Sequence, residues 1–110
     1  MATIRVLPLD VEITASEGDT VMGAAQAEGY YWPTTCGGEA RCTTCACEVV
    51  EGGGALTDMG RAERRALVAE RGEAVLASPV RLACQARLAR GGSVMVVKPG
   101  VRRPLDVAAP

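Results

Sequence analysis

The stretch "TTCGGEARCTTCACEVV", residues 34–50, holds four of the five cysteines of this 110-residue chain and two adjacent glycines. Three of its thiols follow a fixed spacing: Cys36, five residues, Cys42, two residues, Cys45. Cys47 comes two positions later. Thiols crowded in this way, with an odd total in the chain, disfavour a framework of disulfides and favour metal or redox chemistry.

Length and composition suit a single domain over residues 1–110, and we expect a loosely packed tail over residues 100–110. Hydrophobic residues make up 48% of the chain, with no apolar run near the roughly 20 residues of a bilayer span. The start "MATIRVLPLDVE" carries no secretory pattern. We therefore expect a soluble cytoplasmic protein without a membrane partner.

Charge and residue usage exclude several classes of function. No basic run with interleaved aromatics indicates nucleic-acid binding. The chain has no histidine, which removes the commonest general base and excludes a Rieske centre. Residues 1–58 carry nine acids and two bases, whereas residues 59–110 carry four acids and ten bases. Eleven arginines against one lysine are typical of a GC-rich genome, and we expect a bacterial source.

The first third of the chain predicts a hairpin followed by a helix. Residues 3–7 and 11–14 are β-prone runs separated by a short turn. The segment after them predicts a helix with Asp19 or Thr20 as its N-cap and Gly29 as its end.

The rest of the chain predicts three strands and a second helix. Residues 45–50 alternate as a strand that three glycines end, and the second helix is capped near Thr57 or Asp58 and stops at Gly72. The better apolar positions of this helix are Ala62, Ala66, Leu67 and Ala69. Residues 80–88 alternate as a strand, and residues 93–99 supply the last one. This order indicates an α+β domain with a mixed sheet packed on one main helix.

Cys84 is the fourth thiol of the candidate site, and it arrives from the distant strand 38 residues after Cys45. A tetrahedral zinc is usually held by two compact pairs of ligands, which this spacing matches poorly. A thioredoxin-like pair at Cys42 and Cys45 would need a helix start, and this pair leads into a strand. A 2Fe-2S cluster needs two thiolates at each end, and one loop can supply three of the four.

The motifs "CGGEARCTTC" and "RLACQ" resemble the 2Fe-2S ferredoxins, and the five-residue first gap is similar to their adrenodoxin and putidaredoxin branch. The segment "EGDTVMGAAQAEG" is similar to the helix that precedes the cluster in that family. The resemblance implies a β-grasp fold and one 2Fe-2S cluster. It also implies that Cys36 and Cys42 hold the outer iron and that Cys45 and Cys84 hold the inner iron.

The resemblance also implies a cluster loop whose residues surround the cofactor. Gly37 and Gly38 leave room for amide groups to turn toward sulfur. Thr43 and Thr44 are candidates to donate hydrogen bonds to the sulfurs, or are small exposed loop residues. The expected cofactor-binding residues are Cys36, Gly37, Gly38, Glu39, Ala40, Arg41, Cys42, Thr43, Thr44, Cys45 and Cys84.

By this resemblance the chain is a monomeric one-electron carrier and not an enzyme. A flavoprotein ferredoxin reductase would supply the electron, and a haem monooxygenase or a Rieske-type oxygenase would receive it. Two alternatives stay open at this point: a ferredoxin that serves iron-sulfur cluster assembly, and a zinc-binding interaction module.

The chain departs from that branch in the second helix, where the relatives carry acidic docking residues. Here the helix is basic, with Arg61, Arg64, Arg65 and Arg71. Partners are expected either at acids of the cluster rim (Glu39 with Glu48, Glu51 or Asp58) or at these arginines through an acidic face of their own. The alternative is a solvated helix face with no docking role. We expect Cys47 to be a small buried core residue, with an alternate ligand or a redox sensor as the other reading. We expect Tyr30, Tyr31 and Trp32 to anchor a helix end to the core.

Overall fold

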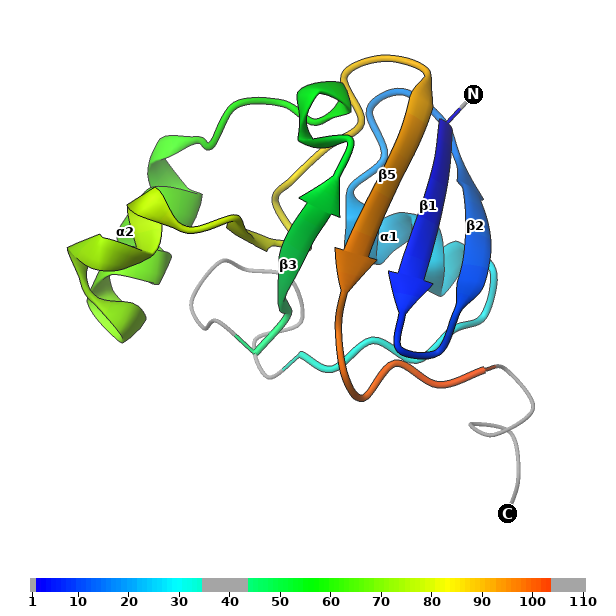
Figure 1. Cartoon of the computed structure of the whole chain (residues 1–110), viewed down its shortest axis with the longest axis horizontal. Helices are drawn as coiled ribbons and strands as arrows, with labels where there is room; N and C mark the ends of the chain where they lie inside the picture. Colours follow the sequence, from blue (N-terminus) through cyan, green and yellow to red (C-terminus); the bar gives the residue numbers. More distant parts are fainter. Residues whose placement is uncertain (1, 35–43, 104–110) are drawn as a thin grey trace.

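The computed structural model describes residues 2–34 and 44–103. Its sheet has five strands in the order β2-β1-β5-β3-β4, with α1 against one face and α2 beyond the β4 edge (Figure 1). The expected mixed sheet is confirmed, because β1 pairs parallel with β5 while the other three pairings are antiparallel. The elements are β1 (Ala2–Leu7), β2 (Val11–Ala15), α1 (Val21–Ala27), β3 (Ala46–Glu51), η1 (Gly53–Ala55), α2 (Arg61–Arg71), η2 (Glu73–Ala77), β4 (Val80–Leu82) and β5 (Gly92–Val97).

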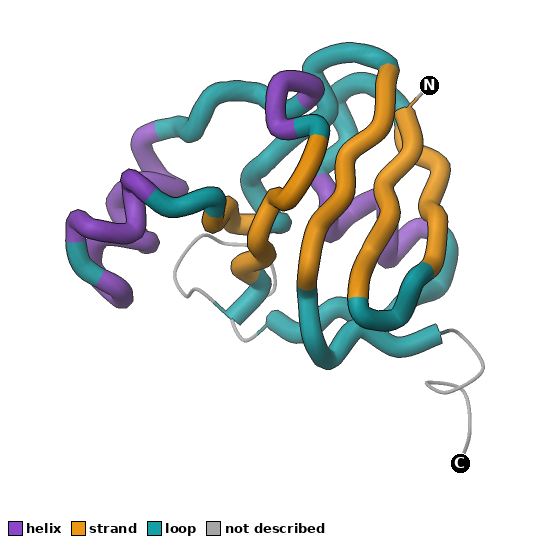
Figure 2. The backbone as a smooth tube through the Cα atoms, viewed as in Figure 1, coloured by secondary structure: helices purple, strands orange, loops and turns teal. Residues whose placement is uncertain are grey.

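The hairpin and β5 form the apolar half of the sheet. Ile4 faces Ile13 across the β1–β2 ladder and Val94 across the β1–β5 ladder, and all three side chains are buried. Their neighbours along each strand are more exposed, so one face carries the core. The expected hairpin and the expected last strand are therefore confirmed, and Figure 2 shows these strands lying side by side.

Helix α1 has the boundaries that the sequence predicts. The Thr20 Oγ1 atom accepts a hydrogen bond from the backbone N–H of Gly23 at 2.9 Å, which makes Thr20 the N-cap. The helix ends at Ala27, and Gly29 follows with φ +87°, a backbone conformation that favours glycine.

Helix α2 begins later than expected, at Arg61, with Gly60 as its N-cap. Thr57 does not cap it, because the Thr57 Oγ1 atom accepts a hydrogen bond from the backbone N–H of Arg87 at 3.3 Å. The expected buried face is also wrong in part: Ala62 and Ala69 are exposed, and Glu63 is buried in their place. The expectations for Ala66 and Leu67, which are buried, and for an end at Gly72 are confirmed.

The strand expected over residues 80–88 ends at Leu82. The chain turns there, because the N–H groups of Gln85 and Ala86 both donate to the carbonyl of Leu82 at 2.9 Å. The reason lies in α1, whose first N–H groups have no partner within the helix. The carbonyls of Ala83 and Ala86 in this turn accept hydrogen bonds from those N–H groups. A continued strand would not place these carbonyls against the helix.

The described chain after β5 is packed as far as residue 102. Val101 is buried, and Arg102 forms a β-bridge with Tyr31. Of the segment for which we expected loose packing, residues 104–110 lie outside the described residues. Within the described ranges, no helix is long and apolar enough to cross a membrane.

Candidate metal centre

Cys45 and Cys84 lie at the same end of the β3–β4 pair. Cys45 directly precedes β3, and Cys84 comes two residues after β4. Because Ala46 pairs with Leu82 in an antiparallel register, the residues just outside both strands leave the sheet at one place. Both cysteines are buried, with 0% and 6% of their surface exposed. The structure thus brings together two of the four expected ligands.

Helix α1 fixes the backbone on both sides of Cys84. The N–H of Met22 donates to the carbonyl of Ala83 at 2.9 Å, and the N–H of Val21 donates to the carbonyl of Ala86 at 3.0 Å. The two bonds satisfy groups that the helix start would leave open. They also hold the Cys84 turn against the core.

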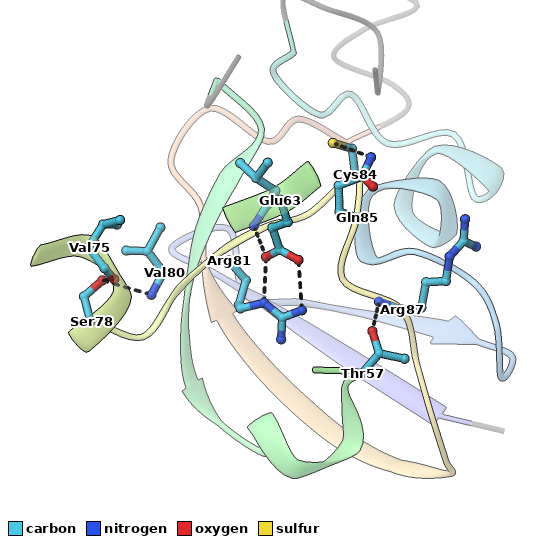
Figure 3. A network of polar contacts seen from close by, with 10 residues as sticks. Thr57, Glu63, Val75, Ser78, Val80, Arg81, Cys84, Gln85 and Arg87 are labelled. Atoms are coloured by element: carbon cyan, nitrogen blue, oxygen red, sulfur yellow. Dashed lines mark hydrogen bonds and ion pairs between the residues drawn. The ribbon is translucent and has the colours of Figure 1, made fainter. Parts of the chain in front are cut away.

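Glu63, on α2, holds the backbone of β4 just before Cys84 (Figure 3). Its carboxylate accepts from Arg81 Nε at 2.6 Å, from Arg81 Nη2 at 3.0 Å and from the backbone N–H of Leu82 at 2.9 Å. Only 1% of Glu63 is exposed. A buried carboxylate is tolerated when it is paired and hydrogen-bonded in this way. Sequence reasoning missed this residue, although a lone acid between arginines on the inner face of the helix is a usable signal.

Trp32 supports the backbone of Cys45. Its indole Nε1–H donates to the Cys45 carbonyl at 3.0 Å, and the ring is buried. The expectation that this residue anchors the end of the first helix to the core is confirmed. Tyr31 differs, because it is 44% exposed and its ring lies 5.5 Å from the guanidinium carbon of Arg102.

Two further contacts at the centre were not expected from the sequence. Lys98 Nζ donates to the carbonyl of Thr44, the last residue before Cys45. Gln85 Nε2 donates to the Sγ atom of Cys84 at 3.6 Å (Figure 3). The position of Gln85 directly after a candidate ligand is the only sequence signal that could have singled it out.

Cys47 is a buried residue of β3, as expected. Burial raises the pKa of its thiol to about 12, although the positive charges of Lys98 and Arg81 act in the opposite direction. A protonated thiol is neither a metal ligand nor a nucleophile. The reading of Cys47 as a core residue is therefore favoured over a redox sensor.

Thr34 provides a test of whether the centre fits a sulfur-rich cofactor. Its hydroxyl oxygen is buried and has no hydrogen-bond partner within the part of the chain that the structure describes. A buried hydroxyl without a partner costs about 1–3 kcal/mol, and sulfides or thiolates accept hydrogen bonds from hydroxyls. In the sequence, Thr34 lies two residues before Cys36, the first expected ligand. The centre therefore fits an iron-sulfur cluster.

The other expected residues of the centre lie outside the described residues. They are Cys36, Gly37, Gly38, Glu39, Ala40, Arg41, Cys42 and Thr43. Within residues 2–34 and 44–103, no group of three or more His, Cys, Asp and Glu side chains could hold a metal ion. Two of the four expected ligands are outside those ranges, so the ligand set remains a prediction.

Comparison with known protein families identifies the class of this metal centre. The family model for the 2Fe-2S iron-sulfur cluster binding domain matches residues 4–89, which span the cysteine loop and Cys84. The chain belongs to this family. No curated protein gives a significant match.

Solved structures agree with the family. The ISC-like 2Fe-2S ferredoxin FdxB from Pseudomonas putida is 25% identical with a TM-score of 0.69, covering 90% of this chain and 93% of its own. A ferredoxin from Rhodopseudomonas palustris is also 25% identical, with a TM-score of 0.63 and coverage of 93% and 98%. The cytochrome P450 reductase GcoB from Amycolatopsis, at 23% identity and TM-score 0.71, shares the fold over 94% of this chain and 28% of its own.

The expected β-grasp ferredoxin fold and the expected cofactor are thus confirmed. The chain is a ferredoxin-type electron carrier with one 2Fe-2S cluster. The zinc-binding alternative is set aside, because the matched family is defined by its iron-sulfur cluster.

Proposed function

We propose that this ferredoxin takes one electron at a time from a flavoprotein ferredoxin reductase and passes it to an oxygenase. It does so as a cytoplasmic monomer and converts no substrate itself. The observation that carries the proposal is the placement of Cys45 and Cys84, both buried at one end of the β3–β4 pair within a matched 2Fe-2S domain.

Two further observations support this role. The fold of this chain occurs as part of a larger cytochrome P450 reductase, which favours an oxygenase system as the setting. The chain lacks histidine. Among the described residues, Glu63 is the one deeply buried acid, and its carboxylate already accepts hydrogen bonds from Arg81 and from a backbone N–H. Neither feature favours acid-base chemistry.

The residues of the chain have distinct tasks in this role. Cys36, Cys42, Cys45 and Cys84 would hold the cluster, which supplies the uptake and release of one electron. The Trp32 indole and the turn carbonyls bound to α1 keep the backbone of Cys45 and Cys84 in place. The burial of both described ligands keeps water from two of the thiolates.

The test begins with anaerobically purified protein. We expect about two irons and two acid-labile sulfides per chain, with visible bands that bleach on reduction by dithionite. We then expect reduction by NADH or NADPH through a flavoprotein ferredoxin reductase, followed by turnover of a supplied cytochrome P450 or Rieske oxygenase. A colourless protein with about one zinc per chain would overturn the proposal, and a red-brown protein that supports no oxygenase would remove its second half.

A role in iron-sulfur cluster assembly is the second candidate. It is favoured by the likeness to an ISC-like ferredoxin over nearly the whole of both chains. The two roles separate in one assay, in which the reduced protein is offered to an oxygenase and to a cysteine desulfurase with its scaffold protein. Faster cluster formation on the scaffold, without oxygenase turnover, would replace the first candidate by this one.

The exposed face of α2 is the surface that we propose for the partner. The side chains that line a surface hollow here are three arginines, two apolar residues and one acid: Arg61, Arg64, Arg65, Val68, Ala69 and Glu73. Three guanidinium groups around apolar side chains fit an acidic partner face with an apolar centre. This surface is tied to the centre through the Glu63 contacts with β4.

Charge reversal tests this surface. The double variant Arg64→Glu and Arg65→Glu should slow reduction by the reductase about tenfold at low salt and flatten the salt dependence of the rate. The control is Arg90→Glu with Arg103→Glu, two exposed positions outside α2 that change the net charge equally. Equal effects of the two double variants would show that net charge, and not this surface, sets the rate.

A further inference from the structure

We propose that the side-chain amide of Gln85 raises the reduction potential of the cluster by donating a hydrogen bond to the sulfur of Cys84. The proposal rests on the role of Cys84 as a ligand, which is part of the proposed function. Gln85 is thereby a tuning residue of the electron carrier rather than a ligand of the iron.

The contact itself is short and local. Gln85 Nε2 lies 3.6 Å from Cys84 Sγ, a normal length for a donor to sulfur because sulfur is large (Figure 3). Cys84 is buried and Gln85 is half-buried, so bulk water does not replace this donor freely.

The backbone keeps the amide in reach of the sulfur. The N–H of Gln85 donates to the carbonyl of Leu82 at 2.9 Å, which closes the turn after β4. The carbonyls of Ala83 and Ala86 on either side are bound to the first turn of α1. The side chain therefore starts from a fixed backbone position, from which its amide reaches the sulfur.

Electrostatics decides the direction of the effect. Reduction adds one negative charge to the cluster and its thiolates. The positive end of the N–H dipole stabilises the reduced form more than the oxidised form, and it does so strongly where water is excluded. Hydrogen bonds to sulfur are among the known determinants of iron-sulfur potentials. Removing this donor should lower the potential.

The experiment compares two substitutions at this position with a matched control. Gln85→Leu keeps the approximate size of the side chain and removes the donor, and Gln85→Glu replaces the donor by a negative acceptor. Gln26→Leu is the control, because Gln26 is the only other glutamine of the chain and is exposed on α1. Each protein is purified anaerobically, its iron and sulfide are assayed, and its potential is measured by a spectroscopic redox titration.

We expect Gln85→Leu to reduce the ratio of reduced to oxidised protein about threefold at a fixed solution potential. This corresponds to roughly 28 mV at 59 mV per tenfold change for one electron. Gln85→Glu should lower the ratio further, and Gln26→Leu should leave it unchanged. An unchanged potential in loaded Gln85→Leu protein would overturn the proposal.

The remaining outcomes are also decisive. If Gln85→Leu does not retain the cluster, the potential of Gln85→Glu decides, and a value equal to or above that of the wild type overturns the proposal. A wild-type protein without iron and sulfide would overturn the cluster assignment as well. Equal potentials in loaded wild-type and variant proteins overturn the role of Gln85 alone.

Discussion

The two halves of the sheet are held together by different physics. On the β1–β2–β5 side, strands of five or six residues pair in regular register and bury aliphatic side chains. On the β3–β4 side, the edge strand has three residues, and the register between β3 and β5 shifts between Val49 and Glu51. The contacts that join α2 to this side include hydrogen bonds from the Arg81 guanidinium and from the backbone N–H of Leu82 to the Glu63 carboxylate.

The comparison teaches where this protein depends on its cofactor. Burial of aliphatic surface stabilises the first half without a ligand, at about 25 cal/mol per Å². The second half carries both described cysteines of the centre and has less regular pairing, so ligation of iron is expected to contribute to its stability. The protein thus combines a scaffold with a segment that the cluster completes.

The largest effect is expected from removing a ligand. Cys84→Ala should abolish the visible absorption of the cluster and reduce hydrogen-exchange protection in residues 44–48 and 80–88, because these segments lose their common attachment. Protection in β1, β2 and β5 should remain. Equal loss of protection in both halves would contradict the claim that only the β3–β4 half depends on the cluster. Cys47→Ala is the matched control, and it should retain the cluster because that thiol belongs to the core.

The next effect in size is expected at Glu63. Glu63→Ala leaves Arg81 and the N–H of Leu82 without their buried acceptor, which should cost about 3–5 kcal/mol of unfolding free energy. Denaturant unfolding of the loaded protein measures this cost, with Glu70→Ala on the exposed face of α2 as control. A cost below about 1 kcal/mol would show that α2 is held by its apolar residues alone.

A smaller effect is expected at Trp32. Trp32→Phe removes the donor to the Cys45 carbonyl and leaves a small cavity, with a cost of about 2 kcal/mol. The variant should load the cluster and then lose it faster to an iron chelator than the wild type does. Unchanged chelation kinetics would mean that the Cys45 backbone is held without the indole.

The smallest effect is expected in the apolar half. Ile13→Val removes one buried methylene and should cost about 1 kcal/mol of unfolding free energy.

Ile13 and Glu63 belong to different halves, so the double variant Ile13→Val with Glu63→Ala should lose the sum of the two single costs in unfolding free energy. A difference from the sum greater than about 0.5 kcal/mol would show that the halves are energetically coupled.

The elements that the sequence predicts well are those determined by neighbouring residues. The β-prone runs at residues 3–7 and 11–14 around a short turn predict the hairpin, and Thr20 and Gly29 predict the ends of α1, because β-propensity, turns and caps depend on a few neighbouring residues. The cysteine spacing predicts the cofactor for a similar reason, since a loop of fixed length must reach both irons.

The elements that the sequence predicts poorly depend on distant partners. Strand β4 stops at Leu82 because α1, sixty residues earlier, needs the carbonyls of the turn. Helix α2 begins at Arg61 because Thr57 is engaged with Arg87, thirty positions away. Glu63 was missed, because its arginine partner is 18 residues away. No local pattern identifies the distant partner in any of these contacts.

The position of β5 in the sheet also determines when the sheet can be completed during protein synthesis. This strand pairs with β1 on one side and β3 on the other, yet it is synthesised after all the other strands in residues 2–34 and 44–103. All five cysteines emerge before it. Until residues 92–97 are available, the β1–β2 and β3–β4 pairs have no strand between them, and closing so distant a contact is slow. Insertion of iron and sulfide into a completed sheet therefore has to follow the synthesis of β5.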